Sequence, residues 1–134
     1  MIPLQEICKK YGIENYTINS DGSIDVDGDV GLYNLNLSKL PLKFRNVSGD
    51  FNCYLNKLTS LDGSPQYVSG YFDCSNNELT TLEGCPQTVG GGFNFHSNKL
   101  TTLVGCPQTV GGYFDCIYNK LTTLEGCPQT VGGY

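Results

Sequence analysis

The strongest constraint on the fold of this chain is a sequence repeat of 21 residues that runs through residues 58–134. One unit reads L-T-x-L-x-G-x-P-Q-x-V-x-G-x-F-x-C-x-x-N-x. A fixed period of this length predicts a solenoid, in which each unit buries its apolar side chains only against its neighbours. The positions that recur at this spacing include two leucine columns and one valine column: Leu58, Leu79, Leu100 and Leu121; Leu61, Leu82, Leu103 and Leu124; Val68, Val89, Val110 and Val131.

Residues 1–35 do not carry the full unit, and we expect them to form an N-terminal cap and a first degenerate turn. Apolar residues at helical spacing predict a helix over Pro3–Tyr11. Proline at its first position supports this, because proline suits the start of a helix. Tyr16–Asn19 and Ser23–Val26, joined through Asp-Gly, predict a β-hairpin. Helix and hairpin would cover the open end of the core. Residues 36–134 would form the repeats, the last of them incomplete.

Within each unit, the alternation of apolar and polar residues predicts one short parallel strand. Side chains of the Phe72 and Cys74 columns should point inward, and the Val68 column should close the far side. The asparagines of the Asn77 column are expected to form a ladder that satisfies buried backbone groups. Prolines of the Pro86 column are expected to fix an extended segment at the back that needs no ladder hydrogen bonds.

The unit resembles a leucine-rich repeat, because Phe72, Cys74, Asn77, Leu79 and Leu82 fall on strand and turn positions of the consensus L-x-x-L-x-L-x-x-N-x-L. Over nearly the whole chain, the pattern G-G-x-F-x-C-x-x-N-x-L-T-x-L-E-G-C-P resembles leucine-rich-repeat-like solenoid proteins of tailed bacteriophages and bacteria. The resemblance implies an α+β solenoid, a stack of short parallel strands with an N-terminal helix plus β-hairpin cap. That family has no single established activity, so the resemblance implies architecture more than function.

The chain is acidic, with 13 acidic and 8 basic side chains and a net charge of −5. Residues 58–134 hold six acids and two bases, so the basic stripe that nucleic-acid binding requires is missing from the repeats. No apolar run approaches the ~18 residues of a membrane span, and the N-terminus lacks the pattern of a secretory signal. We expect no nucleic-acid or membrane partner and a cytoplasmic protein, in the host cytoplasm if phage-encoded. Mimicry of nucleic acid by the acidic surface stays an alternative.

Six of the seven cysteines fall in two repeat columns, which favours a packing role. In other repeats the same two columns hold Phe95 and Ser64, which indicates that these positions are filled for size and apolarity. We therefore expect buried, reduced thiols, with Cys8 the most reactive of the seven. A zinc site is the sharper alternative. The strand column contains Cys53, Cys74 and Cys116, and the loop column contains Cys85, Cys106 and Cys127.

A calcium loop is the other metal site to consider, because Asp25-Val26-Asp27-Gly28-Asp29 resembles the start of one. The pattern requires Gly and Glu where this chain has Val30 and Asn36. The simpler interpretation is a strand in which apolar side chains point inward and the aspartates between them point into solvent. We expect no metal and no cofactor.

The outward positions of the strands vary between units, whereas the inward columns hardly change. This outward face is rich in Tyr and Asp, and exposed tyrosine is typical of interaction surfaces. A solvated sheet face, where Tyr only has good strand propensity, is the alternative. We expect the partner-binding face to contain Tyr54, Tyr71, Asp73, Asn94, His96, Tyr113, Asp115, Ile117 and Tyr118.

These features favour a non-enzymatic protein-binding module, which in a phage would bind and inhibit a host protein or defence component. The alternative is a structural or adhesive repeat element of a larger assembly. A small-molecule binder would need an enclosed pocket, which a continuous ladder of Phe and Leu does not offer. Catalysis has little support, because His96 is the only histidine and its candidate carboxylate partners, Asp73 and Asp115, belong to the turns on either side.

The C-terminal end is expected to be an open edge, because the sequence stops where the next strand of the repeat should start. A two-fold axis would let two such edges cover each other. We therefore expect a homodimer through this end, with Phe114, Cys116, Val131 and Tyr134 at the edge.

Overall fold

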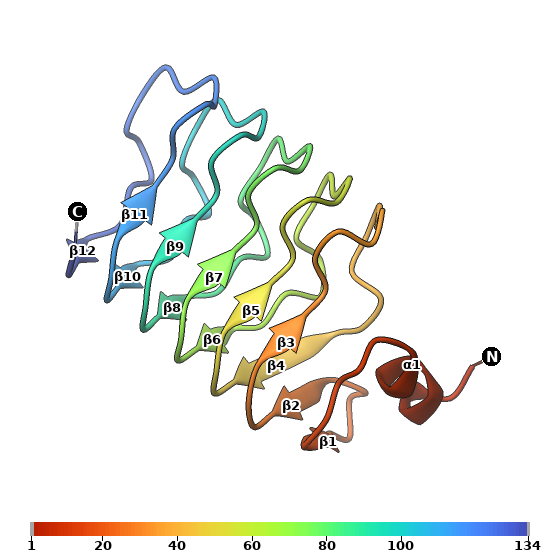
Figure 1. Ribbon diagram of the computed structural model, residues 1–134. Helices are drawn as coiled ribbons and strands as arrows, with labels where there is room; N and C mark the ends of the chain where they lie inside the picture. The colour runs from red at the N-terminus through yellow and green to blue at the C-terminus, as the bar shows by residue number, and fades with distance from the viewer. Residues whose placement is uncertain (1, 134) are drawn as a thin grey trace.

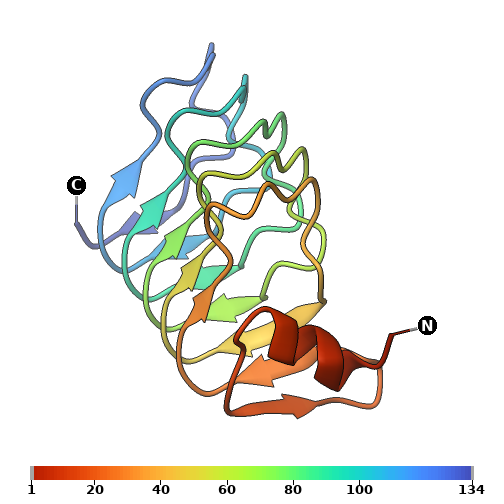
Figure 2. The same ribbon diagram turned by 45° about the vertical axis from the view of Figure 1, so that its right-hand side comes forward.

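The computed structural model describes residues 2–133, which form a β-solenoid of parallel strands with one short α-helix. Successive turns of the chain lie side by side, with the helix at one end of the stack and the last strands at the other (Figure 1 and Figure 2). The predicted solenoid of short parallel strands is therefore confirmed.

Each turn contributes one strand to each of two sheets that face each other across the core. The five-stranded sheet is parallel and has the order β11-β9-β7-β5-β3. Its strands are β3 (Val30–Gly31), β5 (Phe51–Asn52), β7 (Phe72–Asp73), β9 (Phe93–Asn94) and β11 (Phe114–Asp115). Phe72 pairs with Phe93, which is one sequence period away, so one repeat unit makes one turn.

The seven-stranded sheet has the order β1-β2-β4-β6-β8-β10-β12, and only its first pair is antiparallel. Its strands are β1 (Tyr16–Ile18), β2 (Ile24–Val26), β4 (Phe44–Val47), β6 (Tyr67–Val68), β8 (Thr88–Val89), β10 (Thr109–Val110) and β12 (Thr130–Val131). The antiparallel pair is the predicted hairpin, and β2 then continues the sheet by pairing with β4.

This second sheet corrects the expectation that the segment after the prolines lacks ladder hydrogen bonds. The Gln87 amide donates to the Gln66 carbonyl at 2.8 Å, and the Gly90 amide donates to the Val68 carbonyl at 2.9 Å. Proline removes only its own donor. The extended residues that follow it lie in register with their copies in the next turn, so a ladder forms there as well.

The predicted N-terminal helix is confirmed as α1 (Leu4–Lys10). Cys8 on this helix and Ile13 after it are 0% and 4% exposed, and both belong to the apolar core. Figure 2 shows α1 beside the first strands, at the end of the stack that carries the N-terminus.

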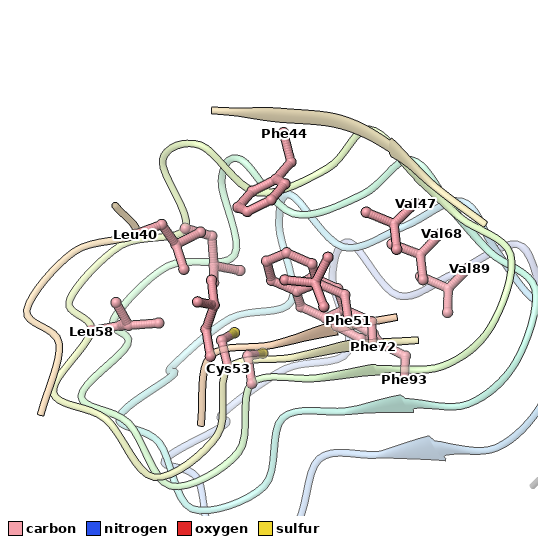
Figure 3. Close-up of a cluster of buried hydrophobic side chains, with 14 of the residues drawn as sticks. Leu40, Phe44, Val47, Phe51, Cys53, Leu58, Val68, Phe72, Val89 and Phe93 are labelled. Carbon is pink, nitrogen blue, oxygen red and sulfur yellow. The ribbon is translucent and has the colours of Figure 1, made fainter. Parts of the chain in front are cut away.

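The core is a column of side chains that repeat from turn to turn (Figure 3). The rings of Phe51, Phe72 and Phe93 follow one another with centroids 5.4 and 5.5 Å apart. They lie between the valine column of the opposite sheet and the side that holds Leu58. Burial of such a side chain contributes about 2 kcal/mol, and a turn obtains it only by stacking on its neighbours.

The asparagine ladder has the structural role expected of it. The Asn77 side-chain amide donates to the carbonyls of Cys74 in its own turn and Cys53 in the preceding turn, both at 3.0 Å. Its Oδ1 accepts from the Leu58 amide at 3.0 Å. One buried side chain therefore satisfies backbone groups of two turns.

The expected burial of the six column cysteines is confirmed for two of them. Cys53 and Cys74 are buried, as is Cys8 on the helix, whereas Cys127 is exposed and three are half-buried: Cys85, Cys106 and Cys116. The expectation that Cys8 is the most accessible thiol is wrong, because α1 packs it into the first layer of the core. Cys127 is exposed because no described turn stacks on the turn that carries it.

We expect thiol titration of the native protein at pH 8 to show one fast-reacting cysteine, Cys127. Burial raises the pKa of the Cys53 and Cys74 thiols far above pH 8 and that of Cys85 to about 12, so little reactive thiolate forms there. Ellman's reagent with and without denaturant measures this difference. Cys127→Ser should remove the fast phase, and its survival in that variant would contradict the assignment.

Candidate functional site

The outer face of the five-stranded sheet carries most of the residues predicted to bind a partner. Because strand side chains alternate, the inward phenylalanines leave Asn52, Asp73, Asn94 and Asp115 on the outside of β5, β7, β9 and β11. These four side chains are half-buried by their neighbours. The register between turns places them in one straight column.

Tyrosines lie on both sides of this column and come from different turns. The rings of Tyr33 and Tyr54 stack with centroids 4.9 Å apart and planes 4° from parallel. Tyr71 and Tyr113 stand in the column that precedes the strands and are 38% and 41% exposed. We call these four residues, together with Asp73, the tyrosine cluster.

Gly92 makes room for one of these rings. A Cβ atom on Gly92 would lie 2.6 Å from both Cδ1 and Cζ of Tyr113, so no other residue fits under the ring without a shift. Gly92 itself is buried beneath the ring, although it occupies a surface column. The ring of Tyr113 therefore lies over the preceding turn, on the side toward Tyr71.

Three of the four outward side chains accept hydrogen bonds at the strand ends: Asp73, Asn94 and Asp115. Asp73 Oδ1 accepts from the backbone amide of Ser75 at 3.0 Å and from its hydroxyl at 2.6 Å. Asp115 accepts from the Ile117 amide at 3.2 Å. These local bonds hold the side chains close to the sheet, which gives the face a defined shape.

The hydroxyl groups of Tyr54 and Tyr113 keep their protons at neutral pH. Burial raises the pKa of Tyr54 and of Tyr113, and the nearby charges of Asp73 and other cluster members raise both further. The cluster therefore combines the neutral phenol groups of Tyr54 and Tyr113, which donate hydrogen bonds, with the carboxylate of Asp73.

His96 contributes to the face without forming a catalytic constellation. Its Nδ1 lies 2.8 Å from Ser97 Oγ in the same turn. Within the described residues, neither Asp73 nor Asp115 hydrogen bonds to the ring, so no third group orients the histidine as a base would need.

A column of strained residues follows the strands. Its five members have φ between 53° and 58°: Asn34, Leu55, Asn76, Ser97 and Tyr118. Asparagine tolerates this left-handed conformation, whereas leucine and tyrosine do so only at a cost of about 1–2 kcal/mol. Leu55 and Tyr118 are nonetheless 49% and 77% exposed, so packing in the core does not offset the strain energy of their backbone.

The structure brings the predicted residues onto one face but spreads them along the stack. Ile117 and Tyr118 belong to the turn of β11, about 14 Å from the turn that carries Tyr54. Three residues whose spacing also predicts this face are not among the predicted binding residues: Tyr33, Leu55 and Gly92. Tyr33 repeats the position of Tyr54 one period earlier, which is a sequence signal for it, whereas the role of Gly92 depends on where the Tyr113 ring lies.

The C-terminal turns are less covered than the central ones. Phe114, Cys116 and Val131 of the predicted edge are half-buried, and Tyr134 lies outside the described residues. Leu124 is 70% exposed, whereas its equivalent Leu103 is 1% exposed. Apolar surface is therefore accessible at this end of the stack.

The aspartates of the candidate calcium loop hold neighbouring turns together. Asp25 pairs with Arg45, Asp27 accepts from the Ser48 hydroxyl at 2.9 Å, and Asp29 accepts from a backbone amide at 2.8 Å. Among residues 2–133, His, Cys, Asp and Glu do not gather in a group of three that could hold a metal ion.

Comparison with models of protein families, with curated proteins and with solved structures gives no match. Within the described part of the chain, no helix has the length and apolar character needed to cross a membrane.

Proposed function

We propose that this chain is a non-enzymatic protein-binding module whose working surface is the outer face of the five-stranded sheet. The observation that carries the proposal is the tyrosine cluster, in which exposed rings from different turns gather on one rigid surface. Tyrosine offers a large contact area at a low entropic cost, and solenoids present such faces to partners. Core packing does not require these residues, because they lie outside it.

The strained column supports the same proposal. The backbone at these positions favours asparagine, which Asn34 and Asn76 supply, yet Leu55 and Tyr118 hold exposed apolar side chains. Backbone strain that no gain in packing offsets is typical of functional sites.

The finer architecture belongs to this proposal too. We assign the turns to a leucine-rich-repeat-like unit on the strength of the sequence pattern. We assign α1 and the β1–β2 hairpin the role of a cap over the first turn, which the burial of Cys8 and Ile13 at that end supports. The resemblance to phage proteins favours a factor that binds and inhibits a host protein or defence component in the host cytoplasm.

The alternative is a structural or adhesive element of a larger assembly, which the accessible C-terminal turns favour. The two functions differ in the surface they use. A binding module uses the strand face, whereas an assembly element uses the ends of the stack.

Tyr71→Ala combined with Tyr113→Ala should abolish capture of a host protein by this chain. Each truncated aromatic anchor costs about 2 kcal/mol or more, or roughly 30-fold in affinity. The control is Gln87→Ala with Gln108→Ala, at exposed positions beside the other sheet, which should leave capture unchanged. Circular dichroism checks folding. If the control variant loses the partner and the tyrosine variant keeps it, the strand face is not the binding surface.

Leu55→Asn should stabilise the protein by about 1 kcal/mol, because asparagine relieves the strain of the left-handed backbone. Chemical denaturation measures the change, and partner affinity should fall in the same variant. Asn76→Leu, at the equivalent position one turn later, is the matched control and should destabilise by a similar amount. A loss of stability in Leu55→Asn would show that Leu55 is kept for packing.

We also propose that the chain forms a homodimer through its C-terminal turns. Half-buried Phe114, Cys116 and Val131, together with exposed Leu124, would be covered by the second copy. Sedimentation at high micromolar concentration should show a dimer, which Leu124→Asp shifts toward monomer. A monomer under those conditions contradicts the dimer, and a concentration-dependent polymer favours the assembly element.

A further inference from the structure

The charged side chains on the face that carries the tyrosine cluster are mostly negative. Four aspartates, one of them Asp73, stand on or beside its strands, and the salt bridges within the described residues involve other groups. The four are Asp29, Asp50, Asp73 and Asp115. The lysines of these turns follow the strained column, beyond the strand ends, and one of them, Lys99, pairs with Glu78 at 3.8 Å. The central part of the face is therefore aromatic and negative.

Asp73 has acceptor capacity to spare. Its Oδ1 is used by both donors of Ser75, while its Oδ2 has no hydrogen-bond partner in the described part of the chain. Asp73 lies in the strand column between the two groups of rings, with Tyr71 two residues before it in the same turn and Tyr54 after the neighbouring strand β5. An unused carboxylate oxygen thus lies among tyrosine rings.

A second unused acceptor lies one turn away. Asn52 pairs directly with Asp73 in the strand register. Its Oδ1 is buried and has no hydrogen-bond partner. A buried acceptor without a partner is costly, by about 1–3 kcal/mol, and native proteins seldom leave one unsatisfied. Because this atom is covered by its surroundings, a donor from a partner can meet it only if the Asn52 side chain turns outward.

We propose that the tyrosine cluster recognises an arginine side chain in an exposed segment of the partner protein, held by the Asp73 carboxylate and stacked on the tyrosine rings. The inference rests on the proposed function and names the chemistry of the partner. A guanidinium group carries five N–H donors, enough for Asp73 Oδ2 and also for Asn52 Oδ1 once that side chain turns outward. Its plane also stacks on aromatic rings, which the compact ammonium group of lysine does less well.

The rigidity of the cluster supports this recognition. Asp50 Oδ1 accepts from the Tyr71 backbone amide at 2.9 Å, and Gly92 leaves space for the Tyr113 ring. The stacked pair of Tyr33 and Tyr54 limits motion on the other side. A preformed site of this kind reduces the entropy lost on binding.

The test uses three blocked heptapeptides with the same Gly-Ser sequence and a central arginine, lysine or citrulline. Citrulline has nearly the shape of arginine but no charge. In an NMR titration of the full chain, the arginine peptide should shift the tyrosine ring signals at millimolar concentration. The citrulline peptide should bind at least tenfold more weakly, with lysine in between. Equal binding of arginine and citrulline would overturn the proposal.

Asp73→Asn should weaken binding of the arginine peptide at least tenfold without unfolding the chain, because Asn94 occupies the same position in the next turn. Glu83→Gln, at an exposed turn outside the face, removes the same charge and should change the affinity less than twofold. Equal losses in both variants would reduce the effect to general charge attraction and reject the proposal. If partner capture depends on Tyr71 and Tyr113 but not on Asp73, the arginine assignment fails while the binding module stands. If the tyrosines do not matter either, both fail.

Discussion

Hydrogen bonding between adjacent turns is the interaction on which the rest of this structure depends. A solenoid has no central core, so each turn is held by the turn before and the turn after it. The Asn77 amide bonds backbone groups of its own turn and of the preceding one. Such bonds fix the register at one repeat, and that register stacks Phe72 on Phe51 and Phe93 in the interior. The outward columns are straight for the same reason.

This arrangement separates stability from recognition. The inward columns must repeat because each ring packs on its copy, whereas an outward residue contacts mainly solvent or its neighbour in the column. The same backbone therefore carries Tyr71, Gly92 and Tyr113 at equivalent positions. Exchanging those residues changes the surface and leaves the core contacts in place. Strain at Leu55 and Tyr118 indicates that some stability is given up on this face.

Most of the architecture could be predicted because periodicity is a property of the sequence alone. The helix, the hairpin, the inward phenylalanines and the asparagine ladder all follow from spacing and residue type. The second sheet was harder to predict, because its strands are only two residues long in most turns, as in Thr88–Val89. Two residues give no alternation to detect, and the proline before them suggested a segment without pairing. The exposure of Cys127 could not be predicted either, because it depends on whether a further turn packs on the turn that carries this residue.

The sequence by itself determined the period, the direction of the chain through each turn and the identity of the buried columns. Only the tertiary structure decided which surface residues meet. The period places Tyr33 beside Tyr54, but the stacking of their rings and the cover of Gly92 by the Tyr113 ring are seen only in the structure. Such contacts depend on side-chain directions that are set when one turn packs on the next. Spacing shows which residues are neighbours, but neither spacing nor local propensity determines the directions that their side chains take.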